Sequence, residues 1–587
     1  MDDQQRKLVE ELLFSEKKKP SFAKQLYFGI FDAKAVFPYP KVPSGEQQKT
    51  KAFVEKVEEL AKNMIDPVAI DRQAEIPEKV IRSLADLGVL GMTIPKEYGG
   101  LGLSQDAYCR AVEVIAKRCG STALFINAHQ SIGLKALLLF GTDEQRKRWL
   151  IPLAKGENLA AFSLTEPNAG SDASGVETRA VYDPVKNVYI INGKKQWITN
   201  GGIAKVLTVM AQTTVETPQG KQDKITAFLV TPDMSGFKVT AQALEKVGMR
   251  GSKTANLEFH NMEVPAANIL GPLGGGLKVC LTVLDYGRTT FGATCTGAAK
   301  MLLEKAIEHS RSRYQFKRPL GSFGLVKEKI ARMAALVYAI ESTTYMTAGF
   351  VDSGVEDFML EAAMLKVFAS DSLWSIVYDT MQIYGGRSFF TDAPFERMMR
   401  DARLNMIGEG SNEVMRAFIG VVGMRDVGVA MQGVAEALKS PLKDMSLLKQ
   451  FGLTLMKRIS APQIPIQSSI LREEADMLGK AVRRFGFSIL RLLGKHREAI
   501  LEKQLSLDRI ATSAIAIYTT TAVLSRLDAA LKEAGNDHTV LKNDILSGRL
   551  YCRLAMGSLK NSLDTLFDNH DAFIEEVSDQ ITGIRYP

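Results

Sequence analysis

The stretch "NVYIINGKKQWITNG" (residues 187–201) combines β-branched and aromatic residues between turn formers, a pattern typical of a β-strand. Runs of the same kind follow at 206–215, 224–232 and 254–265, separated by turn residues. Outside about 160–270 the apolar residues recur at spacings of three and four, which predicts helices. We therefore expect a compact antiparallel β domain between two helical regions.

This order of elements argues against a doubly wound nucleotide-binding fold, because such a fold alternates strands and helices. The glycine-rich "GPLGGG" (271–276) follows the β block as a connector into a helix. Four prolines between residues 20 and 43 predict an extended arm before the first helix. The expected segments are an N-terminal arm (1–47), an N-terminal helical domain (48–159), a middle β domain (160–272), a C-terminal helical bundle (273–430), a basic amphipathic linker (431–464) and an additional C-terminal helical domain (465–587).

The composition is that of an ordinary soluble protein. At 587 residues, with 46% hydrophobic and 24% charged residues, the chain is long enough for roughly three or four domains. The five cysteines form no CxxC pair and the six histidines no HxxxH set, so neither a disulfide framework nor a metal site is expected. No run approaches the ~18 to 20 apolar residues of a membrane span, and the start lacks a secretory signal.

Most of the net charge of +8 comes from residues 439–503, which hold 13 basic and 6 acidic residues. Aromatic residues are not interleaved with these charges, so we expect no nucleic-acid partner. Within 439–460, apolar residues recur every fourth position from Leu447 to Ile459, among lysines and arginines. The segment is either a helix in peripheral contact with an anionic membrane or a basic helix packed on its own protein.

A single carboxylate, Glu409, lies between two glycines in "IGEGSNEVMRA" (407–417). Glycine on each side removes neighbouring bulk and permits unusual backbone turns. One interpretation is a helix start capped by Ser411 or Asn412. The other is that a ligand must approach this carboxylate closely.

Three other stretches each allow a structural and a functional interpretation. The loop "LTEPNAGSD" (164–172) is either a turn between helix and strand or a set of donors for a polar heterocycle. Trp197 is either a core residue or a cover for an aromatic ring. Arg313 is either solvated or a ligand of a pyrophosphate, because its fork of donors matches phosphate oxygens.

Four stretches in this order resemble the acyl-CoA dehydrogenase family: "FSLTEPNAGSD" (162–172), "QWITNGG" (196–202), "RYQFKRPL" (313–320) with "QIYGGRSF" (382–389), and "RDARLNMIGEGSNE" (400–413). The resemblance covers about residues 45–430. It implies an α+β fold with an N-terminal helical domain, a middle antiparallel β-barrel and a C-terminal four-helix bundle. An extra C-terminal helical domain follows here.

The resemblance implies an FAD-dependent enzyme in which Glu409 is the catalytic base that removes the α proton of an acyl-CoA. The residues it assigns to FAD are Phe162, Leu164, Thr165, Gly170, Ser171, Trp197, Ile198, Thr199, Arg313, Gln315, Phe316, Gln382, Ile383, Gly385, Gly386, Ser411, Asn412 and Glu413. Substrate contacts fall on Ser171, Asp285, Arg288 and Gly410. Because Arg313 and Gln382–Gly386 are implied to reach FAD from a neighbouring subunit, a homodimer is expected.

The extra C-terminal residues, with "HQSIGLKALLLFGT" (129–142) and "FGLVKEKIARM" (323–333), resemble the very-long-chain branch and its paralogue that assists respiratory complex I assembly. This branch implies a long-chain acyl-CoA substrate in fatty acid β-oxidation and electron-transfer flavoprotein as electron acceptor. An assembly scaffold with a retained flavin site and an acyl-CoA oxidase are the alternatives. The expected location is the bacterial cytoplasm at the inner face of a membrane, or the matrix side of the mitochondrial inner membrane.

Two positions depart from the family pattern. Gly408 replaces an aromatic residue often found before the base, and Lys317 replaces a frequent glycine. Phe125 and Asn127 are expected at the floor of the acyl pocket, where both would shorten it.

Overall fold

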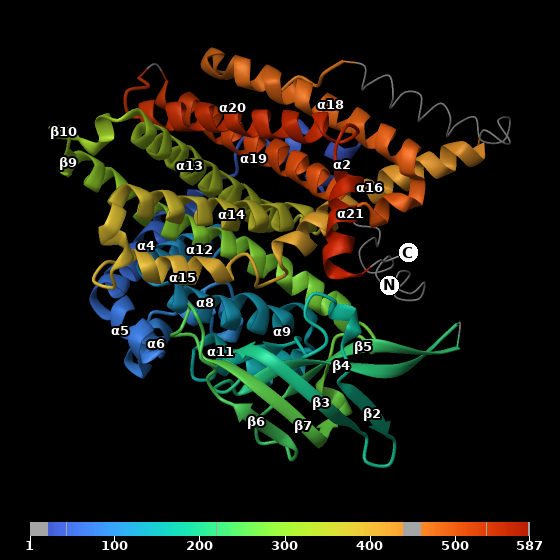
Figure 1. Ribbon diagram of the computed structural model, residues 1–587. Helices are drawn as coiled ribbons and strands as arrows, with labels where there is room; N and C mark the ends of the chain where they lie inside the picture. Colours follow the sequence, from blue (N-terminus) through green and yellow to red (C-terminus); the bar gives the residue numbers. More distant parts are fainter. Residues whose placement is uncertain (1–20, 43, 219, 438–459, 536, 585–587) are drawn as a thin grey trace. The chain divides into compact units, whose positions relative to one another are not determined.

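The computed structural model describes residues 21–42, 44–218, 220–437, 460–535 and 537–584. By their contacts these residues fall into two compact units, Pro40–Ser411 and Pro20–Tyr39 with Asn412–Pro587. The larger unit runs from helices to a sheet and back to helices (Figure 1). The predicted α+β class and its order of elements are confirmed.

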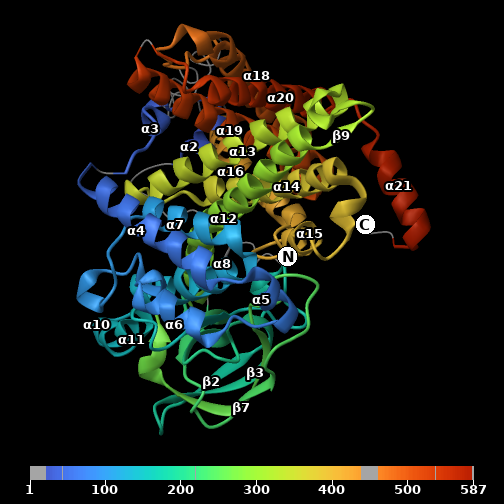
Figure 2. The same cartoon turned by 90° about the vertical axis from the view of Figure 1, so that its left-hand side faces the viewer.

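Side chains cap the starts of some N-terminal helices of the larger unit. Asp66 accepts hydrogen bonds from the Val68 and Ala69 N–H groups at the start of α5, and Ser104 caps α7. In Figure 2, α7 lies between α4 and α12 of the later bundle and contacts both. The helices are α4 (Ser44–Met64), α5 (Pro67–Gln73), α6 (Glu78–Asp86), α7 (Gln105–Arg118), α8 (Gly120–Asn127), α9 (Lys135–Phe140), α10 (Asp143–Gln145) and α11 (Ile151–Ala154), with a π-helical stretch at Ala128–Leu134.

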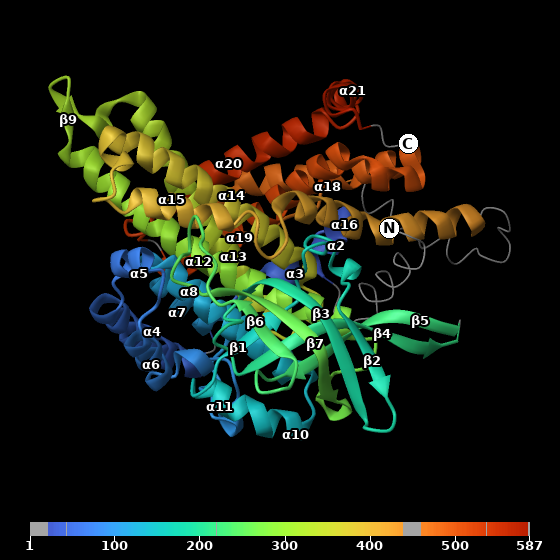
Figure 3. The ribbon, with the colours of Figure 1, turned by 60° about the horizontal axis from the view of Figure 1, so that its bottom comes forward.

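The middle domain is an eight-stranded sheet in the order β6-β7-β3-β2-β4-β5-β8, with β1 paired to β4 (Figure 3). Its strands are β1 (Ala160–Ser163), β2 (Arg179–Asp183), β3 (Val188–Thr199), β4 (Val206–Thr217), β5 (Gly220–Val230), β6 (Phe237–Ala241), β7 (Thr254–Pro265) and β8 (Ile269–Leu270). The expectation of a wholly antiparallel sheet is corrected in two places, since β1 and β2 both pair with β4 in parallel. Residue alternation along a strand is the same in either direction, so the sequence pattern did not distinguish them.

A buried histidine fixes the sheet to the N-terminal helices. His129 Nδ1 accepts a hydrogen bond from the Ala160 N–H at 3.0 Å, and its Nε2 lies 3.2 Å from the Leu153 carbonyl oxygen. Burial lowers the pKa of His129 to about 4, so the ring stays neutral and can serve as acceptor. One apolar core, which includes Leu134, Leu229 and Val279, continues from these helices through the sheet into α12.

The C-terminal part of the larger unit is built on α12 (Gly276–Ser312), α13 (Gly324–Asp352), α14 (Met359–Tyr384) and α15 (Phe395–Leu404). A small hairpin, β9 (Tyr314–Gln315) with β10 (Arg318–Pro319), joins α12 to α13. Helix α12 has 37 residues and is therefore roughly 55 Å long. Figures 1 and 3 show α12, α13 and α14 packed together, with the hairpin at the end remote from the sheet.

The smaller unit joins the N-terminal arm to the last helices of the chain. It comprises α2 (Phe22–Tyr27), α3 (Ala33–Val36), α16 (Asn412–Ala437), α18 (Arg472–His496), α19 (Gln504–Ala534), α20 (Lys542–Asp564) and α21 (Asp571–Thr582). The arm is not extended as expected, because Ser21 and Asp32 cap two short helices between the prolines. The Tyr27 hydroxyl donates to the Ile419 carbonyl at 2.7 Å, and a methyl group on Gly423 would lie 2.0 Å from the Tyr27 ring.

Two described helical stretches have the length and hydropathy of a membrane span, contrary to the sequence expectation. They are Gly120–Phe140 and Gln504–Ala534, and 72% and 89% of their most apolar windows are buried inside the protein. Such burial is typical of core helices. Nearly all of the basic segment 439–460 lies outside the described residues.

Candidate active site

Glu409 lies on the short connection between α15 and α16, in a backbone conformation that is rare for residues with a side chain. Its φ angle is 57° and that of Gly410 is 91°, so both residues are left-handed. A non-glycine residue in this region carries a conformational cost and persists where the surrounding structure holds it. At Gly408 a methyl group would meet nothing closer than 3.6 Å, so the approach to the carboxylate is open on that side.

The two oxygens of the Glu409 carboxylate have different surroundings. Oε1 accepts a hydrogen bond of 3.2 Å from Asn127 Nδ2, at the point where α8 turns into the π-helical stretch. Oε2 is buried and accepts no hydrogen bond within the described protein. Helix α12 passes directly beside it, because a methyl group on Gly287 would lie 2.8 Å from Oε2. One oxygen is thus held in place while the other is available to take a proton.

Two cations hold the backbone carbonyls of Glu409 and of the residue after it. Lys366 Nζ donates to the Gly410 carbonyl at 2.6 Å, and Arg288 Nε donates to the Glu409 carbonyl at 3.4 Å. Arg288 also pairs with Asp285 at 3.0 Å. Both residues of this pair, which the resemblance assigned to the substrate, are buried.

The electrostatics make Glu409 a competent base near neutral pH. Burial raises its pKa to about 7, although Arg288, Lys366 and the Asn127 hydrogen bond each act to lower it. A carboxylate with a pKa near the working pH is suited to removing a proton. Burial also lowers the pKa of Lys366 to about 8, and Glu409 opposes that shift.

Sequence reasoning missed Lys366 and the close approach of Gly287, and it placed Asn127 only at the pocket floor. A signal for Lys366 existed, since it is the one basic residue in the apolar run "EAAMLKVFAS" (361–370) on α14. Phe125 belongs to the core of the N-terminal helices, and its carbonyl accepts a hydrogen bond from Asn200. The sequence does not distinguish Asn127, which contacts Glu409, from Phe125, which lies in the core, because the difference depends on which elements meet in space.

The loop predicted to bind a heterocycle is tied to β3 by a fully buried ion pair. Glu166 and Lys195 are 2.6 Å apart, with side chains 2% and 0% exposed. Glu166 also accepts hydrogen bonds from the Glu177 and Thr178 N–H groups, and Lys195 Nζ donates to the Leu164 carbonyl at 3.0 Å. Residues 164–178 are therefore held as one rigid wall.

The family resemblance assigns a flavin ring to this wall and to Trp197 on the neighbouring strand β3. Trp197 is 62% exposed in a left-handed conformation, next to a register shift between β3 and β7. An aromatic side chain held outward in this way offers a face for stacking. Gly170 has open space around it and Ser171 is exposed. Phe162 and Ile198 are buried in cores, so only their backbone groups are placed to meet a ligand.

The remaining predicted FAD residues form a second, separate set. Arg313, Gln315 and Phe316 are exposed at the hairpin. Gln382 is exposed in the last turn of α14 and Gly385 and Gly386 are exposed after it, whereas Ile383 is buried in the bundle. Arg288 and Arg313 are 25 residues apart along α12, which corresponds to roughly 37 Å. The second set therefore lies far along α12 from Arg288, which contacts the Glu409 carbonyl. Ser411 continues the Glu409 loop, and Asn412 and Glu413 begin α16.

Among the described residues, no group of three or more histidine, cysteine, aspartate or glutamate side chains is arranged to hold a metal ion. The five cysteines are buried free thiols. The titratable chemistry described above therefore centres on one carboxylate and two cations.

A helical domain, a β domain and a helical bundle in this order form the architecture of the flavoprotein dehydrogenases that the resemblance implied. The chain belongs to the acyl-CoA dehydrogenase family. Family models match it in order: acyl-CoA dehydrogenase, N-terminal domain (residues 47–157), middle domain (161–262) and C-terminal domain (274–423), then ACAD9/ACADV, C-terminal domain (469–584). It is an FAD-dependent acyl-CoA dehydrogenase.

Known proteins extend the likeness to the very-long-chain branch. The chain is 36% identical to human very long-chain specific acyl-CoA dehydrogenase, mitochondrial, over 93% of this chain and 84% of that one. It is 38% identical to probable acyl-CoA dehydrogenase FadE10 of Mycobacterium tuberculosis, over 71% and 65%. An acyl-CoA dehydrogenase from Bacillus anthracis, solved with FAD, superposes with a TM-score of 0.77 at 28% identity and 95% coverage of both chains.

Proposed function

We propose that the protein desaturates long-chain acyl-CoA to trans-2-enoyl-CoA in fatty acid β-oxidation, with Glu409 as the base. The observation that carries the proposal is the Glu409 carboxylate itself, which is buried with one oxygen unpartnered and has a pKa of about 7. The left-handed turn that presents it is anchored by Lys366 and Arg288. A surface helix cap requires none of these features.

In this proposal Glu409 Oε2 takes the α proton of the thioester, and Asn127 keeps the other oxygen fixed. Removing that proton places negative charge on the thioester oxygen, which hydrogen-bond donors must stabilise. Lys366 and Arg288 stabilise the ionised base electrostatically and keep its loop in position. When bound, FAD supplies the acceptor for the hydride that leaves the β carbon. Trp197, Thr199, Gly170 and Ser171 would hold its ring, as the exposed wall allows.

The pH dependence of turnover tests this role. Glu409 must be ionised to accept a proton, so kcat/KM is expected to rise with pH and to level off above about 7. In Lys366→Met a nearby positive charge is lost, and the rising limb should move to higher pH by about one unit or more. Lys366→Arg, which keeps the charge, should leave the limb near its original position. An unshifted limb in Lys366→Met would exclude the proposed coupling.

We propose that the enzyme is a homodimer in which FAD bridges the two copies. Support comes from the separation of roughly 37 Å along α12 between Arg288, beside Glu409, and Arg313 in the second set of predicted FAD residues. Arg313, Gln315 and Gln382 of one copy would then reach the FAD held by the wall of the other. Arg313→Ala is expected to weaken FAD binding, and mixed dimers with Glu409→Gln should regain one working site.

For the substrate we propose long acyl chains and electron transfer to electron-transfer flavoprotein. The support is the likeness to the very long-chain relatives and to their C-terminal domain. Anaerobic bleaching of the flavin by acyl-CoAs of graded length would test chain length, and a preference for butyryl-CoA would contradict it. Reduction of added electron-transfer flavoprotein without hydrogen peroxide is expected, whereas one peroxide per turnover would identify an oxidase.

We propose a peripheral location at a membrane, at the matrix side in an organelle or the inner face in a bacterium. The named mitochondrial relatives support the first option. Flotation of the protein with anionic vesicles tests whether it binds a membrane surface. A variant without residues 439–459 should stay unbound, and equal flotation of both proteins would contradict the proposal.

A further inference from the structure

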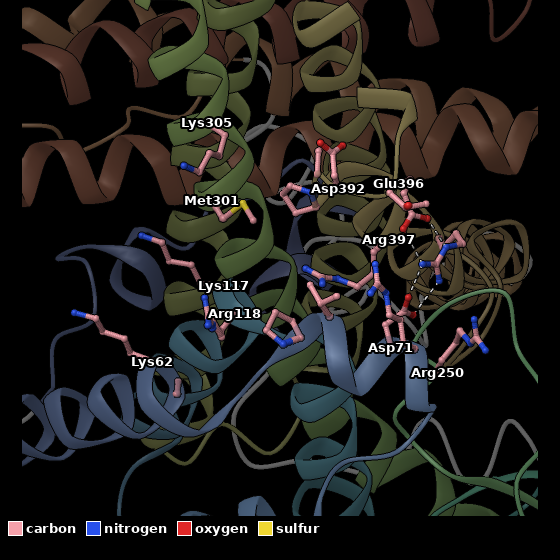
Figure 4. A pocket seen from close by; sticks show the side chains of 18 of the residues that line it. Lys62, Asp71, Lys117, Arg118, Arg250, Met301, Lys305, Asp392, Glu396 and Arg397 are labelled. Carbon is pink, nitrogen blue, oxygen red and sulfur yellow. Dashed lines mark hydrogen bonds and ion pairs between the residues drawn. The ribbon is translucent and has the colours of Figure 1, made fainter. Parts of the chain in front are cut away.

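The larger unit contains a cavity whose lining does not include Glu409. The cavity has a volume of about 830 Å³ and lies between the C-terminal ends of α4 and α7, helix α5, the last third of α12 and the first turns of α15. None of the residues described above for the base or for FAD lines it. Figure 4 shows Lys62, Lys117 and Lys305 along one side, with Arg397 near the centre. We call it the basic cavity.

The lining carries eight basic residues and four acidic ones. Asp71 and Glu396 both bind Arg400, at 2.7 and 2.8 Å, and Asp392 binds Arg387 outside the cavity. Lys117 and Lys305 pair with glutamates outside the lining. The acidic residues are therefore mostly occupied, and Lys62, Arg72 and Arg118 form no ion pair within the described part of the chain. The basic cavity holds a clear excess of positive charge.

Two arginines in the lining have unused hydrogen-bonding groups. Arg397 is only 8% exposed, yet it makes no hydrogen bond or ion pair with a described residue. Asp401 lies near enough to interact electrostatically, but its Oδ1 accepts from the Met249 N–H instead. Arg250 Nε is buried without a partner. A buried guanidinium is costly to leave unpaired, so these groups call for an anion.

We propose that the basic cavity binds a phosphate ester of nucleotide size. Guanidinium groups match phosphoryl oxygens through parallel hydrogen bonds, which favours phosphate over a lone carboxylate. The volume lies within the range of small-molecule sites. Apolar lining residues, among them Pro67, Val68 and Met301, provide a surface for a base or another ring. The bound molecule would be a second ligand, distinct from FAD and from the acyl thioester.

The test measures binding of ADP to the full-length, FAD-saturated enzyme by isothermal titration. Saturable binding is expected, and it should weaken in high salt because it depends on charge. Arg397→Met should raise the dissociation constant about 30-fold, since it removes one partner of a buried charged pair. Arg250→Met should act in the same direction, which keeps the test valid if the first variant fails to fold. Arg82→Met, at an exposed arginine outside the cavity, is the matched control and should bind normally.

Inorganic pyrophosphate and adenosine separate the contributions of phosphate and ring. Pyrophosphate is expected to compete with ADP, and adenosine is expected to bind far more weakly. Absence of saturable ADP binding, or equal affinity in the Arg397 and Arg250 variants, would overturn the proposal. Release of flavin on adding ADP would also overturn it, because the ADP would then occupy the FAD site. That outcome would not affect the proposed desaturation. Likewise, loss of turnover in Glu409→Gln would not affect ADP binding.

Discussion

Replacing Glu409 with glutamine is expected to slow acyl-CoA-dependent flavin reduction by on the order of 10²- to 10⁴-fold, the usual contribution of a general base. The amide is nearly the same size as the carboxylate, but it cannot accept the α proton. Because the substitution removes a buried carboxylate with a raised pKa, the folded protein should not lose stability. Stopped-flow absorbance at the flavin band, under anaerobic conditions, measures the effect.

The controls for Glu409→Gln separate chemistry from binding. The variant should retain FAD, because its flavin wall is unchanged. Glu328→Gln, at an exposed carboxylate on α13, should reduce flavin at the original rate. Turnover within a few-fold of the parent enzyme in Glu409→Gln would show that another group removes the proton, and the proposed function would need a different base.

Replacing Lys195 with methionine is expected to destabilise the protein by about 3 to 5 kcal/mol, because it leaves the Glu166 carboxylate buried without its cation. The same pair fixes the loop that forms the flavin wall, through the Leu164 carbonyl and the Thr178 N–H. We therefore expect weaker FAD binding together with a lower melting temperature. Chemical denaturation of the apoprotein and titration with FAD measure the two effects separately.

The double variant Lys195→Met with Glu166→Gln distinguishes this explanation from a simple loss of packing. Once neither group is charged, much of the lost stability should return, although Glu166 hydrogen bonds to the backbone are weakened. If the loss of unfolding free energy in the double variant equals the sum of the losses in the two single variants, the unpaired charge does not explain the destabilisation.

The larger features of the molecule could be predicted from sequence because they repeat along the chain. The change of apolar spacing at both ends of the β block located the sheet, and the glycines around Glu409 marked a position where a backbone turn and a carboxylate coincide. The features that sequence reasoning missed depend on contacts between distant elements. Lys366 reaches Gly410 from α14, and Gly287 on α12 leaves room for Oε2. A lone lysine in an apolar run marked Lys366 as unusual, but nothing local indicates which residue it or Gly287 contacts.

The wrong predictions of strand direction and of an extended arm also arose because both features depend on contacts between distant parts of the chain. A strand has the same alternation whether its neighbour runs parallel or antiparallel, so the pairing of β1 and β2 with β4 could not be read from the residues. In the arm, the prolines suggested an extended chain throughout. The segment between them is long enough for two capped helices, and its apolar side chains pack on helices that come much later in the sequence.

The packing of α2 on α16 affects the order in which the protein can assemble on the ribosome. Tyr27 and Ile419 are 392 residues apart, so at typical synthesis rates the arm emerges roughly 20 to 80 s before its partner helix does. All of the larger unit is translated in that interval and can fold first. The buried face of α2, with Phe22, Leu26 and Tyr27, meanwhile has no partner within the smaller unit. The smaller unit can therefore complete its core only after the last helices of the chain have been made.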